Sequence, residues 1–244
     1  MHLEFRPAEL SDFGRYREIM EACFGWRPTE AYFRWKYLAN PAGKLIAYEA
    51  LDQGRVAAFY GIIPEHFSVG NERCLFYQSM DTMTHPDYRR LGLFVKLASL
   101  AYQELARRIP DYVLVGIPGT TSFPGFVQKL GWINPFHFKY LFIPRAVFRV
   151  VRHLRGSRGL EFVLVSASDA TFRRYFEHRE PGGDVIAPLL SAEFLQWRVL
   201  DNQSHAYTLV AVHEKGEMIG FAVYRPVDRG RLFIEMIDFL SPHY

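Results

Sequence analysis

The chain has 244 residues, of which 49% are hydrophobic, 16% aromatic and 23% charged. That composition can bury a core in one large domain or two small ones, so it excludes global disorder. The formal net charge of +3 is too small to indicate a nucleic-acid partner, and no apolar run approaches the length of a bilayer span.

The first half alternates strand and helix patterns. Ser11 is expected to cap the first helix and Gly25 to end it, and Asp52-Gln53-Gly54 is a hairpin signal. The predicted helices are Asp12–Phe24, a segment from about Thr29 to Asn40-Pro41, Arg89–Arg107 and Phe123–Leu130. The predicted strands are Leu3–Arg6, Leu45–Leu51, Val56–Ile63, Cys74–Thr84, Tyr112–Ile117 and Phe138–Ile143. Because Tyr112–Ile117 is almost wholly apolar, it should be buried on both faces, and helix crossovers of this kind predict an α/β or α+β layered domain.

The second half repeats landmarks of the first. Ala192–Asp201 resembles Glu30–Ala39, and Trp35 and Trp197 are 162 residues apart (197 minus 35). The same spacing relates Leu38 to Leu200, Asn40 to Asn202, Gly54 to Gly216, Phe59 to Phe221 and Pro64 to Pro226. We therefore predict two copies of one fold, with Trp197 and Phe221 buried and the last strand paired. The second copy is either degenerate or a piece of a longer one.

The segment Thr82–Phe94 lies between a predicted strand and a predicted helix. A strand-to-helix turn exposes unpaired backbone N–H groups, which together with the helix dipole bind phosphate or pyrophosphate. Gly92 lets the backbone approach the anion closely, and Arg89 and Arg90 add positive charge there. The segment is therefore a candidate phosphate-binding loop.

This segment resembles motif A of the GNAT acetyltransferase superfamily, V-x-P-x-Y-R-x-x-G-x-G/A. Thr84 stands in place of the valine, Pro86 of the proline, Tyr88-Arg89 of the Tyr-Arg pair and Gly92 of the first glycine. Phe94 replaces the last small residue, which should crowd the loop.

A second resemblance follows in Ile117–Trp132, which is similar to motif B, N-x-x-A-x-x-F-Y-x-K-x-G-F. Leu130-Gly131-Trp132 fits the end of the motif, and Thr120 and Phe123 occupy the places of its asparagine and alanine. Val127 occupies the place of the tyrosine that protonates the departing thiolate in the family. The resemblance covers Leu3 to about Phe142.

The resemblance implies a mixed central sheet flanked by helices, and acetyl-CoA or another acyl-CoA as the acyl donor, with no metal. Backbone groups of Thr82, Met83 and Thr84 would hold the thioester and the pantetheine arm. The remaining implied cofactor-binding residues are Arg89, Arg90, Leu91, Gly92, Leu93, Phe94, Val95 and Thr120.

Candidates for proton transfer are fewer. Gln78 and Val115 occupy the central-strand positions where a carboxylate often stands, and neither can act as a base. Asp81 is the nearest catalytic candidate, but Asp238 repeats it, which favours a structural role. Ser122 could donate a hydrogen bond to the thiol, or simply cap its helix.

No nucleophilic constellation can be placed on the sequence. His85 is expected to be an exposed loop residue, and no Ser-His-Asp or Cys-His arrangement is evident. Cys23 and Cys74 lie in apolar runs without metal-ligand spacing, and Met1–Leu10 lacks the apolar core of a signal peptide. We therefore predict direct acyl transfer in a reducing, cytoplasmic compartment.

Three regions are predicted: an acyl-CoA-binding GNAT domain at residues 1–144, a basic linker helix at 145–160 and a partial second GNAT-like copy at 161–244. The linker's basic residues are Arg145, Arg149, Arg152, His153, Arg155 and Arg158, with no acid among them. We expect its apolar stripe to pack between the copies, and contact with an anionic membrane surface is the alternative.

The expected reaction is N-acetyl transfer to a small amine or amino sugar, with the acceptor near Trp35, Tyr37 and the cleft between the copies. One alternative is a tandem GNAT-like aminoacyltransferase that uses aminoacyl-tRNA, although the chain lacks a strongly basic composition. The other is a non-catalytic acyl-CoA-binding protein, which Val127 and the missing base favour. A homodimer is left open.

Overall fold

A computed structural model of the chain describes residues 2–11, 13–135, 159–166, 168–177, 186–227 and 233–240. They divide into two compact units, each with its own sheet. Unit 1 comprises Met1–Trp132 and Glu180–Leu190, and unit 2 comprises Ile133–Arg179 and Ser191–Tyr244. The expected strand Phe138–Ile143 and the basic segment at 145–158 lie outside the described residues.

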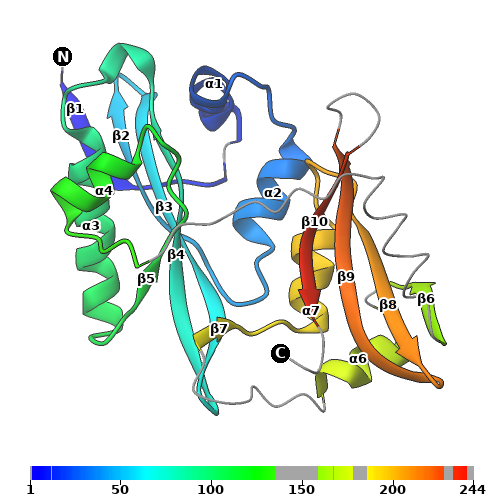
Figure 1. Cartoon of the computed structure of the whole chain (residues 1–244). Helices are drawn as coiled ribbons and strands as arrows, with labels where there is room; N and C mark the ends of the chain where they lie inside the picture. Colours follow the sequence, from blue (N-terminus) through cyan, green and yellow to red (C-terminus); the bar gives the residue numbers. More distant parts are fainter. Residues whose placement is uncertain are drawn as a thin grey trace. The chain divides into compact units, whose positions relative to one another are not determined.

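Unit 1 is built on a mixed sheet (Figure 1). Its strands are β1 (Leu3–Pro7), β2 (Ile46–Asp52), β3 (Arg55–Val69), β4 (Glu72–Thr84) and β5 (Leu114–Val115), in the spatial order β1-β2-β3-β4-β5, with β7 (Ile186–Pro188) paired to the far end of β3. Every pairing is antiparallel except that of β4 with β5, which is parallel. The mixed sheet predicted from the sequence is therefore confirmed.

Helices cover both faces of this sheet (Figure 1). On one face lie α1 (Phe13–Phe24) and α2 (Glu30–Leu38), and on the other lie α3 (Leu93–Arg108) and α4 (Phe123–Leu130). The buried residues of α3 recur at helical spacing and pack on β2 and β3. They are Leu93, Leu97, Ala98, Ala101 and Leu105.

Two predicted elements differ from the observed ones. The third helix starts at Leu93 rather than Arg89, because Arg90 and Gly92 adopt left-handed conformations that no α-helix contains. The strand expected at Tyr112–Ile117 is reduced to β5. Ile117 is 70% exposed and Val113 45%, so the prediction of a strand buried on both faces is wrong. The chain leaves the sheet after Val115.

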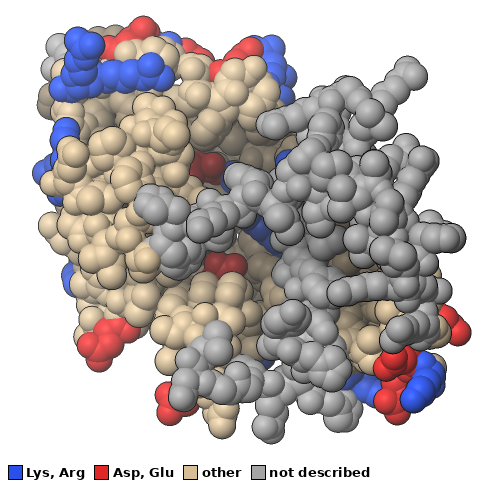
Figure 2. All heavy atoms as spheres, viewed as in Figure 1, with Lys and Arg blue, Asp and Glu red and all other residues tan. Residues whose placement is uncertain are grey.

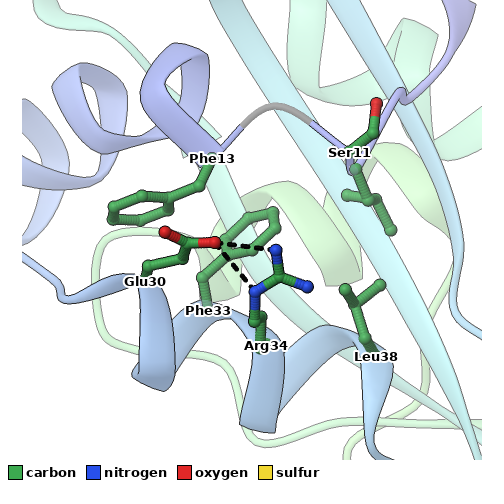
Figure 3. Close-up of a pocket in the computed structure, with 7 residues that line it drawn as sticks. Ser11, Phe13, Glu30, Phe33, Arg34 and Leu38 are labelled. Atoms are coloured by element: carbon green, nitrogen blue, oxygen red, sulfur yellow. Dashed lines mark hydrogen bonds and ion pairs between the residues drawn. The ribbon is translucent and has the colours of Figure 1, made fainter.

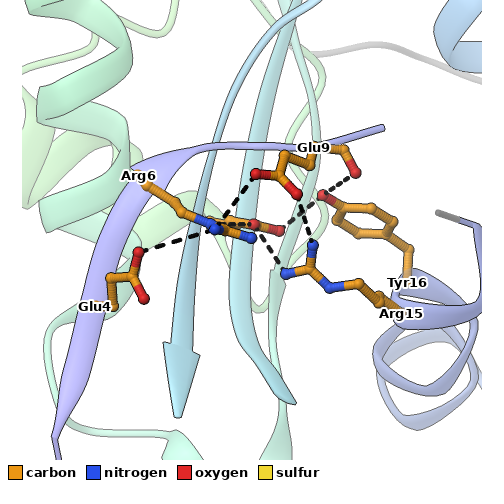
Figure 4. Close-up of polar contacts among 6 residues, drawn as sticks. Glu4, Arg6, Glu9, Arg15 and Tyr16 are labelled. Atoms are coloured by element: carbon orange, nitrogen blue, oxygen red, sulfur yellow. Dashed lines mark hydrogen bonds and ion pairs between the residues drawn. The ribbon is translucent and has the colours of Figure 1, made fainter. Parts of the chain in front are cut away.

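A buried carboxylate ties β1 and α1 to β2 (Figure 4). Glu49 on β2 is fully buried and accepts hydrogen bonds from Arg6, Arg15 and Tyr16, at 3.0, 3.1 and 2.7 Å. Burial and the Glu49 carboxylate raise the pKa of Tyr16 well above its ordinary value. Two guanidinium groups and a phenol balance the buried charge, so this cluster fixes the position of α1 on the sheet.

Unit 2 has a fully antiparallel four-stranded sheet in the order β10-β9-β8-β6. Its elements are β6 (Leu160–Leu164), α6 (Ala170–Glu177), α7 (Ala192–Leu195), the π-helical turn η2 (Gln196–Leu200), β8 (Thr208–Glu214), β9 (Glu217–Val227) and β10 (Phe233–Leu240). Trp197 is 5% exposed and Phe221 is fully buried, and β10 pairs with β9. These three predictions are confirmed.

In the part of the chain that the structure describes, no helix combines the length and apolar character that a membrane crossing requires.

Candidate active site

The turn between β4 and α3 is held by a polar network at its base. The short 3₁₀ helix η1 (Pro86–Tyr88) follows β4, and the Tyr88 hydroxyl donates to Asp52 Oδ2 at 3.0 Å. His85 is only 8% exposed: its Nδ1 accepts from the Asp87 N–H at 3.3 Å, and its Nε2 lies 3.0 Å from Arg55 Nη2. The expectation that His85 is an exposed loop residue is therefore wrong, because the ring packs under the turn and braces it.

Beyond this base, the N-terminus of α3 is open. Gly92 is its N-cap with φ of +74° and offers no side chain to the first N–H groups. A Cβ built on Gly92 would meet no heavy atom within 4 Å, so an anion could approach the backbone there. Left-handed residues at Arg90 and Gly92 flank Leu91, a backbone arrangement related to anion-binding nests.

The charge around this turn suits an anion. Arg89 and Arg90 are exposed, and Leu93, the first residue of α3, is buried. In the space-filling view, Lys and Arg lie among Asp and Glu along the edge that carries the turn between β4 and α3, whereas the surface over α4 and β5 is mostly uncharged (Figure 2). Open N–H groups, the helix dipole and two guanidinium groups therefore converge on one turn.

Phe94 does not crowd this loop, contrary to expectation. Its ring turns inward, 5.0 Å from the Phe126 ring and 6.1 Å from the Tyr60 ring. Gly125 on α4 makes room for it, because a Cβ on Gly125 would lie 2.6 Å from Phe94 Cε1. The large residue in motif A is thus matched by an absent side chain in the neighbouring helix, and the anion-facing backbone stays clear.

β4 leads into the turn through a β-bulge. The pairing with β3 shifts between Phe59 and Gly61, and Asp81 has φ of +46°. Met83 is buried, so it presents only backbone groups, while Thr82 and Thr84 are half-buried. The three residues that the resemblance assigns to the pantetheine arm therefore follow directly after the bulge.

The bulge residue is tied to α2. The Asp81 carboxylate accepts a hydrogen bond from Tyr37 at 2.5 Å and pairs with Lys36 Nζ at 2.7 Å. The side chains of Lys36 and Asp81 are 15% and 12% exposed. Burial lowers the pKa of Lys36, but the Asp81 carboxylate and the Tyr32 hydroxyl outweigh that effect and raise it above the ordinary value. Lys36 is therefore charged at neutral pH.

The sequence identified Asp81 but not its partners. Lys36 lies between Trp35 and Tyr37, which the sequence placed near the acceptor, and an ion pair across 45 positions leaves no local signal. The one available sign was a lysine between two aromatic residues, Trp35 and Tyr37, because a lysine among buried aromatic side chains needs a partner.

The residues of motif B are distributed between solvent and core. Thr120 is exposed in the loop before α4. The Ser122 hydroxyl donates to the Gly119 carbonyl at 3.2 Å and makes no side-chain cap of α4. Val127 is half-buried and offers no polar atom, and the same holds for Val115 on β5. The structure therefore brings no acid or base from motif B to the turn.

A separate cavity of about 170 Å³ lies between the start of α1 and α2 (Figure 3). It is lined by Leu10, Ser11, Phe13, Glu30, Phe33, Arg34 and Leu38. Glu30 and Arg34 neutralise each other at its rim, with Nη2 to Oε1 at 2.7 Å. Trp35 and Tyr37, expected near the acceptor, are 7% and 2% exposed. None of the lining residues belongs to the segment Thr82–Val95.

Among the described residues, no group of three or more His, Cys, Asp or Glu side chains could hold a metal ion. Cys23 lies close to the turn instead of in such a cluster: its Sγ donates to the Thr84 carbonyl at 3.4 Å. Burial raises the pKa of this thiol, although the Thr84 contact and Arg89 act in the opposite direction. A protonated, inward-facing thiol is a poor nucleophile.

In a comparison with protein families, residues 4–133 match the family described as "Acetyltransferase (GNAT) domain". That range covers more than half of the chain and contains the whole turn described above. No curated protein matches the sequence significantly.

Solved structures with a similar fold are distant in sequence. A GCN5-related N-acetyltransferase from Anabaena variabilis matches with 13% identity and a TM-score of 0.65, over 98% of this chain and 59% of that one. A probable N-acyltransferase from Enterococcus faecalis matches with 13% identity and a TM-score of 0.67, over 99% and 58%. A GCN5-related N-acetyltransferase from Kribbella flavida matches with 12% identity and a TM-score of 0.59, over 98% and 57%. This chain therefore spans less than three fifths of the length of these structures.

Proposed function

Because the chain belongs to the GNAT acetyltransferase family, we propose that it transfers an acyl group directly from acetyl-CoA, or another acyl-CoA, to a small amine or amino sugar. The observation that carries this proposal is the open N-terminus of α3, where Gly92 leaves space, no side chain caps the helix and two arginines add charge. A pyrophosphate fits such a place by charge and by hydrogen-bond donors.

We assign the cofactor to residues on either side of the bulge. Backbone groups of Thr82, Met83 and Thr84 would hold the pantetheine arm, and the turn Arg89–Val95 would hold the pyrophosphate. Thr120, exposed before α4, would reach the same ligand. Acyl-CoA supplies the activated carbonyl, and positioning of the amine against it would provide most of the rate.

For Asp81 we propose a positioning role in place of proton abstraction. Both carboxylate oxygens already accept hydrogen bonds, from Lys36 and Tyr37. If Asp81 took up a proton, the Lys36 ammonium would be left buried without its counter-charge, which opposes proton abstraction by this carboxylate. The pair would instead hold the bulge in the shape that the acyl group requires. Ser122 remains a candidate hydrogen-bond donor to the thiol.

We also propose that unit 2 is a second, partial copy of the same fold. The β2–β3 ladder runs from Ile46–Ile62 to Asp52–Arg55, and the β8–β9 ladder runs from Thr208–Tyr224 to Glu214–Glu217. Each number in the second ladder is 162 higher than its counterpart (208 minus 46, 224 minus 62). The irregularity also moves by 162, from Ala50/Leu51 to Val212/His213. Shared register down to a bulge supports common ancestry.

The test has two stages. Calorimetry with coenzyme A should give one site per chain, and absence of binding at about millimolar concentration would contradict the whole proposal. Steady-state assays with acetyl-CoA and a panel of amines, amino sugars and aminoacyl-tRNA then identify the acceptor. Binding without turnover on any acceptor would favour the second candidate, a non-catalytic acyl-CoA-binding protein, which Val127 and the paired Asp81 support.

A further inference from the structure

One hydroxyl sits where β4 and β5 separate. The two strands are joined at Tyr77–Leu114 and Gln78–Val115, and Ser79 is the next residue of β4. Across from it, Gly116 follows β5, and a Cβ on Gly116 would lie 3.6 Å from Ser79 Cβ. From Ser79 to Thr84, β4 has no partner on this side in the described part of the chain. Ser79 therefore marks the inner end of an unpaired strand edge.

The Ser79 hydroxyl is buried and has no hydrogen-bond partner among the described residues. A buried polar atom without a partner destabilises a protein, and native structures contain few of them. A bound ligand that supplies the missing hydrogen-bond partner would remove this cost. The segment Thr82–Thr84, assigned above to the pantetheine arm, begins three residues after Ser79 on the same strand.

A chain of hydrogen bonds runs from the core toward this hydroxyl. Trp132 Nε1 donates to the Tyr102 hydroxyl at 3.0 Å, and the hydroxyls of Tyr102 and Tyr60 lie 2.9 Å apart. Burial and Tyr102 raise the pKa of Tyr60, while the nearby Ser79 hydroxyl acts in the opposite direction. Tyr60 therefore stays protonated at neutral pH, and its hydroxyl lies near that of Ser79 without forming a hydrogen bond to it.

The direction of this chain follows from its first member. An indole N–H can only donate, so Tyr102 accepts from Trp132. If Tyr102 then donates to Tyr60, the Tyr60 proton can point to Ser79, and the Ser79 proton is left for a ligand. In the reverse arrangement the Tyr102 proton has no acceptor within this set. The first arrangement directs the Tyr60 proton toward Ser79 and leaves the Ser79 proton without an acceptor in this set, so a donor is available at the strand edge.

We propose that the Ser79 hydroxyl donates a hydrogen bond to the coenzyme A sulfur, in the role that Val127 leaves vacant. The inference rests on the proposed acyl transfer. In that reaction the amine nitrogen bonds to the carbonyl carbon, and the carbon–sulfur bond breaks with its electron pair on sulfur. The amine loses one proton and the sulfur gains one. Ser79 stabilises the departing sulfur and is itself unchanged, with Tyr60 and Tyr102 as positioning residues behind it.

A ligand pair tests this contact without any acceptor. Coenzyme A and desulfo-coenzyme A, which carries hydrogen in place of the thiol, are titrated into the wild type and into Ser79→Ala. We expect Ser79→Ala to weaken coenzyme A about fivefold relative to desulfo-coenzyme A, as the loss of one hydrogen bond predicts. The effect should grow at alkaline pH, because a hydrogen bond to an ionised sulfur is stronger.

Two serine variants provide the comparison. Ser68→Ala removes a hydroxyl that donates to Ala187 at the far end of β3, so it should leave the ratio of the two affinities unchanged. Ser122→Ala tests the rival donor. A changed ratio in Ser122→Ala but not in Ser79→Ala would overturn the assignment. Loss of all coenzyme A binding by the wild type would instead contradict the proposed function.

Stability gives an independent reading. Removing an unpartnered buried hydroxyl relieves its desolvation penalty, so Ser79→Ala should unfold at the same or a higher temperature than the wild type. Tyr102→Phe keeps the ring but breaks the chain, and it should reduce the coenzyme A preference less than Ser79→Ala does. A Ser79→Ala protein that unfolds at a clearly lower temperature, with an unchanged affinity ratio, would assign the hydroxyl to the fold alone.

Discussion

The two hairpins at the centre of units 1 and 2 have nearly the same backbone but different surroundings. Gln53 and Gly54 turn the first with φ of +50° and +85°, and Lys215 and Gly216 turn the second with φ of +50° and +83°. In unit 1, Leu3 and Phe5 of the neighbouring β1 pack against the core that α3 completes. In unit 2, Phe162 and Leu164 of β6 are 65% and 72% exposed. Strand register therefore depends on the hairpin and not on the helix that covers the sheet.

The chemistry differs as well. Lys36 and Tyr37, which hold Asp81 in unit 1, correspond at the spacing of 162 to Arg198 and Val199. Arg198 lies over the Trp197 ring at 5.8 Å. The helix and the hairpin are present in both units while the polar contact differs, so the backbone fold does not depend on that contact. The following experiments test positions that distinguish the two units or that they share.

The largest effect is expected at the open end of α3. Gly92→Asp places a carboxylate where the pyrophosphate would lie, and coenzyme A binding should weaken at least about 100-fold. Gly92→Asn is the matched control, since Asn has the same size and also tolerates a positive φ. The coenzyme A affinities of the two variants, measured by calorimetry, differ only through the effect of the added charge. In unit 2, Gly216→Asp should leave binding unchanged. Equal losses for Asp and Asn would show that shape, not charge, governs the turn.

The Asp81 pair should give the next largest effect. Asp81→Asn keeps the positive φ but leaves the Lys36 ammonium buried without its counter-charge, so the free energy of unfolding should fall by about 3 kcal/mol. Adding Lys36→Met should recover most of it. The counterpart in unit 2, Arg198→Met, should cost only about 0.5–1 kcal/mol. Urea denaturation measures all four proteins, and an Asp81→Asn loss no larger than that of Arg198→Met would contradict the buried pair.

The two hairpin glycines should behave alike. Gly54→Ala and Gly216→Ala each force a side chain into a left-handed turn, although neither Cβ would meet an atom within 4 Å. Each should cost about 1 kcal/mol of unfolding free energy, from backbone strain alone. Thermal denaturation of the two variants measures both costs. Costs that differ several-fold would weaken the case that the turns are copies.

A smaller effect is expected at alkaline pH. The folded pKa of Lys36 lies above the ordinary value of 10.5, so the folded state binds this proton more tightly than the unfolded state. Its contribution is fully present below that value and is lost as pH rises through the folded pKa. The stability difference between the wild type and Lys36→Met should therefore shrink in alkaline solution. A difference that grows with pH would reverse the assigned sign.

The elements of unit 1 were predictable because their signals are local. Thr29 caps α2 as its position suggested, Gly25 ends α1, and the Asp52-Gln53-Gly54 turn joins β2 to β3. The turn that opens α3 was found for the same reason, because glycine and arginine at a strand-to-helix junction carry their chemistry locally.

What failed depended on distant contacts. His85 looked like an exposed loop residue because nothing nearby in the sequence indicates the contact between Arg55 and its Nε2. The strand Tyr112–Ile117 was too long because an apolar run does not reveal where the chain leaves the sheet. The hydrogen bonds from Trp132 through Tyr102 to Tyr60 join residues from three separate segments, and each of them alone is typical of an ordinary core.

The contact of Phe94 with Gly125 constrains how this protein can change over time. Because a Cβ at Gly125 would lie 2.6 Å from the Phe94 ring, any side chain there is disfavoured while the phenyl group remains. Shrinking Phe94 first would leave a hole beside Phe126 that destabilises the core by several kcal/mol, about 3–5 for full truncation. A substitution at Phe94 or at Gly125 alone is therefore destabilising. Substitutions at the two sites should appear together among descendants of this sequence, which makes the pair an inherited marker of its lineage.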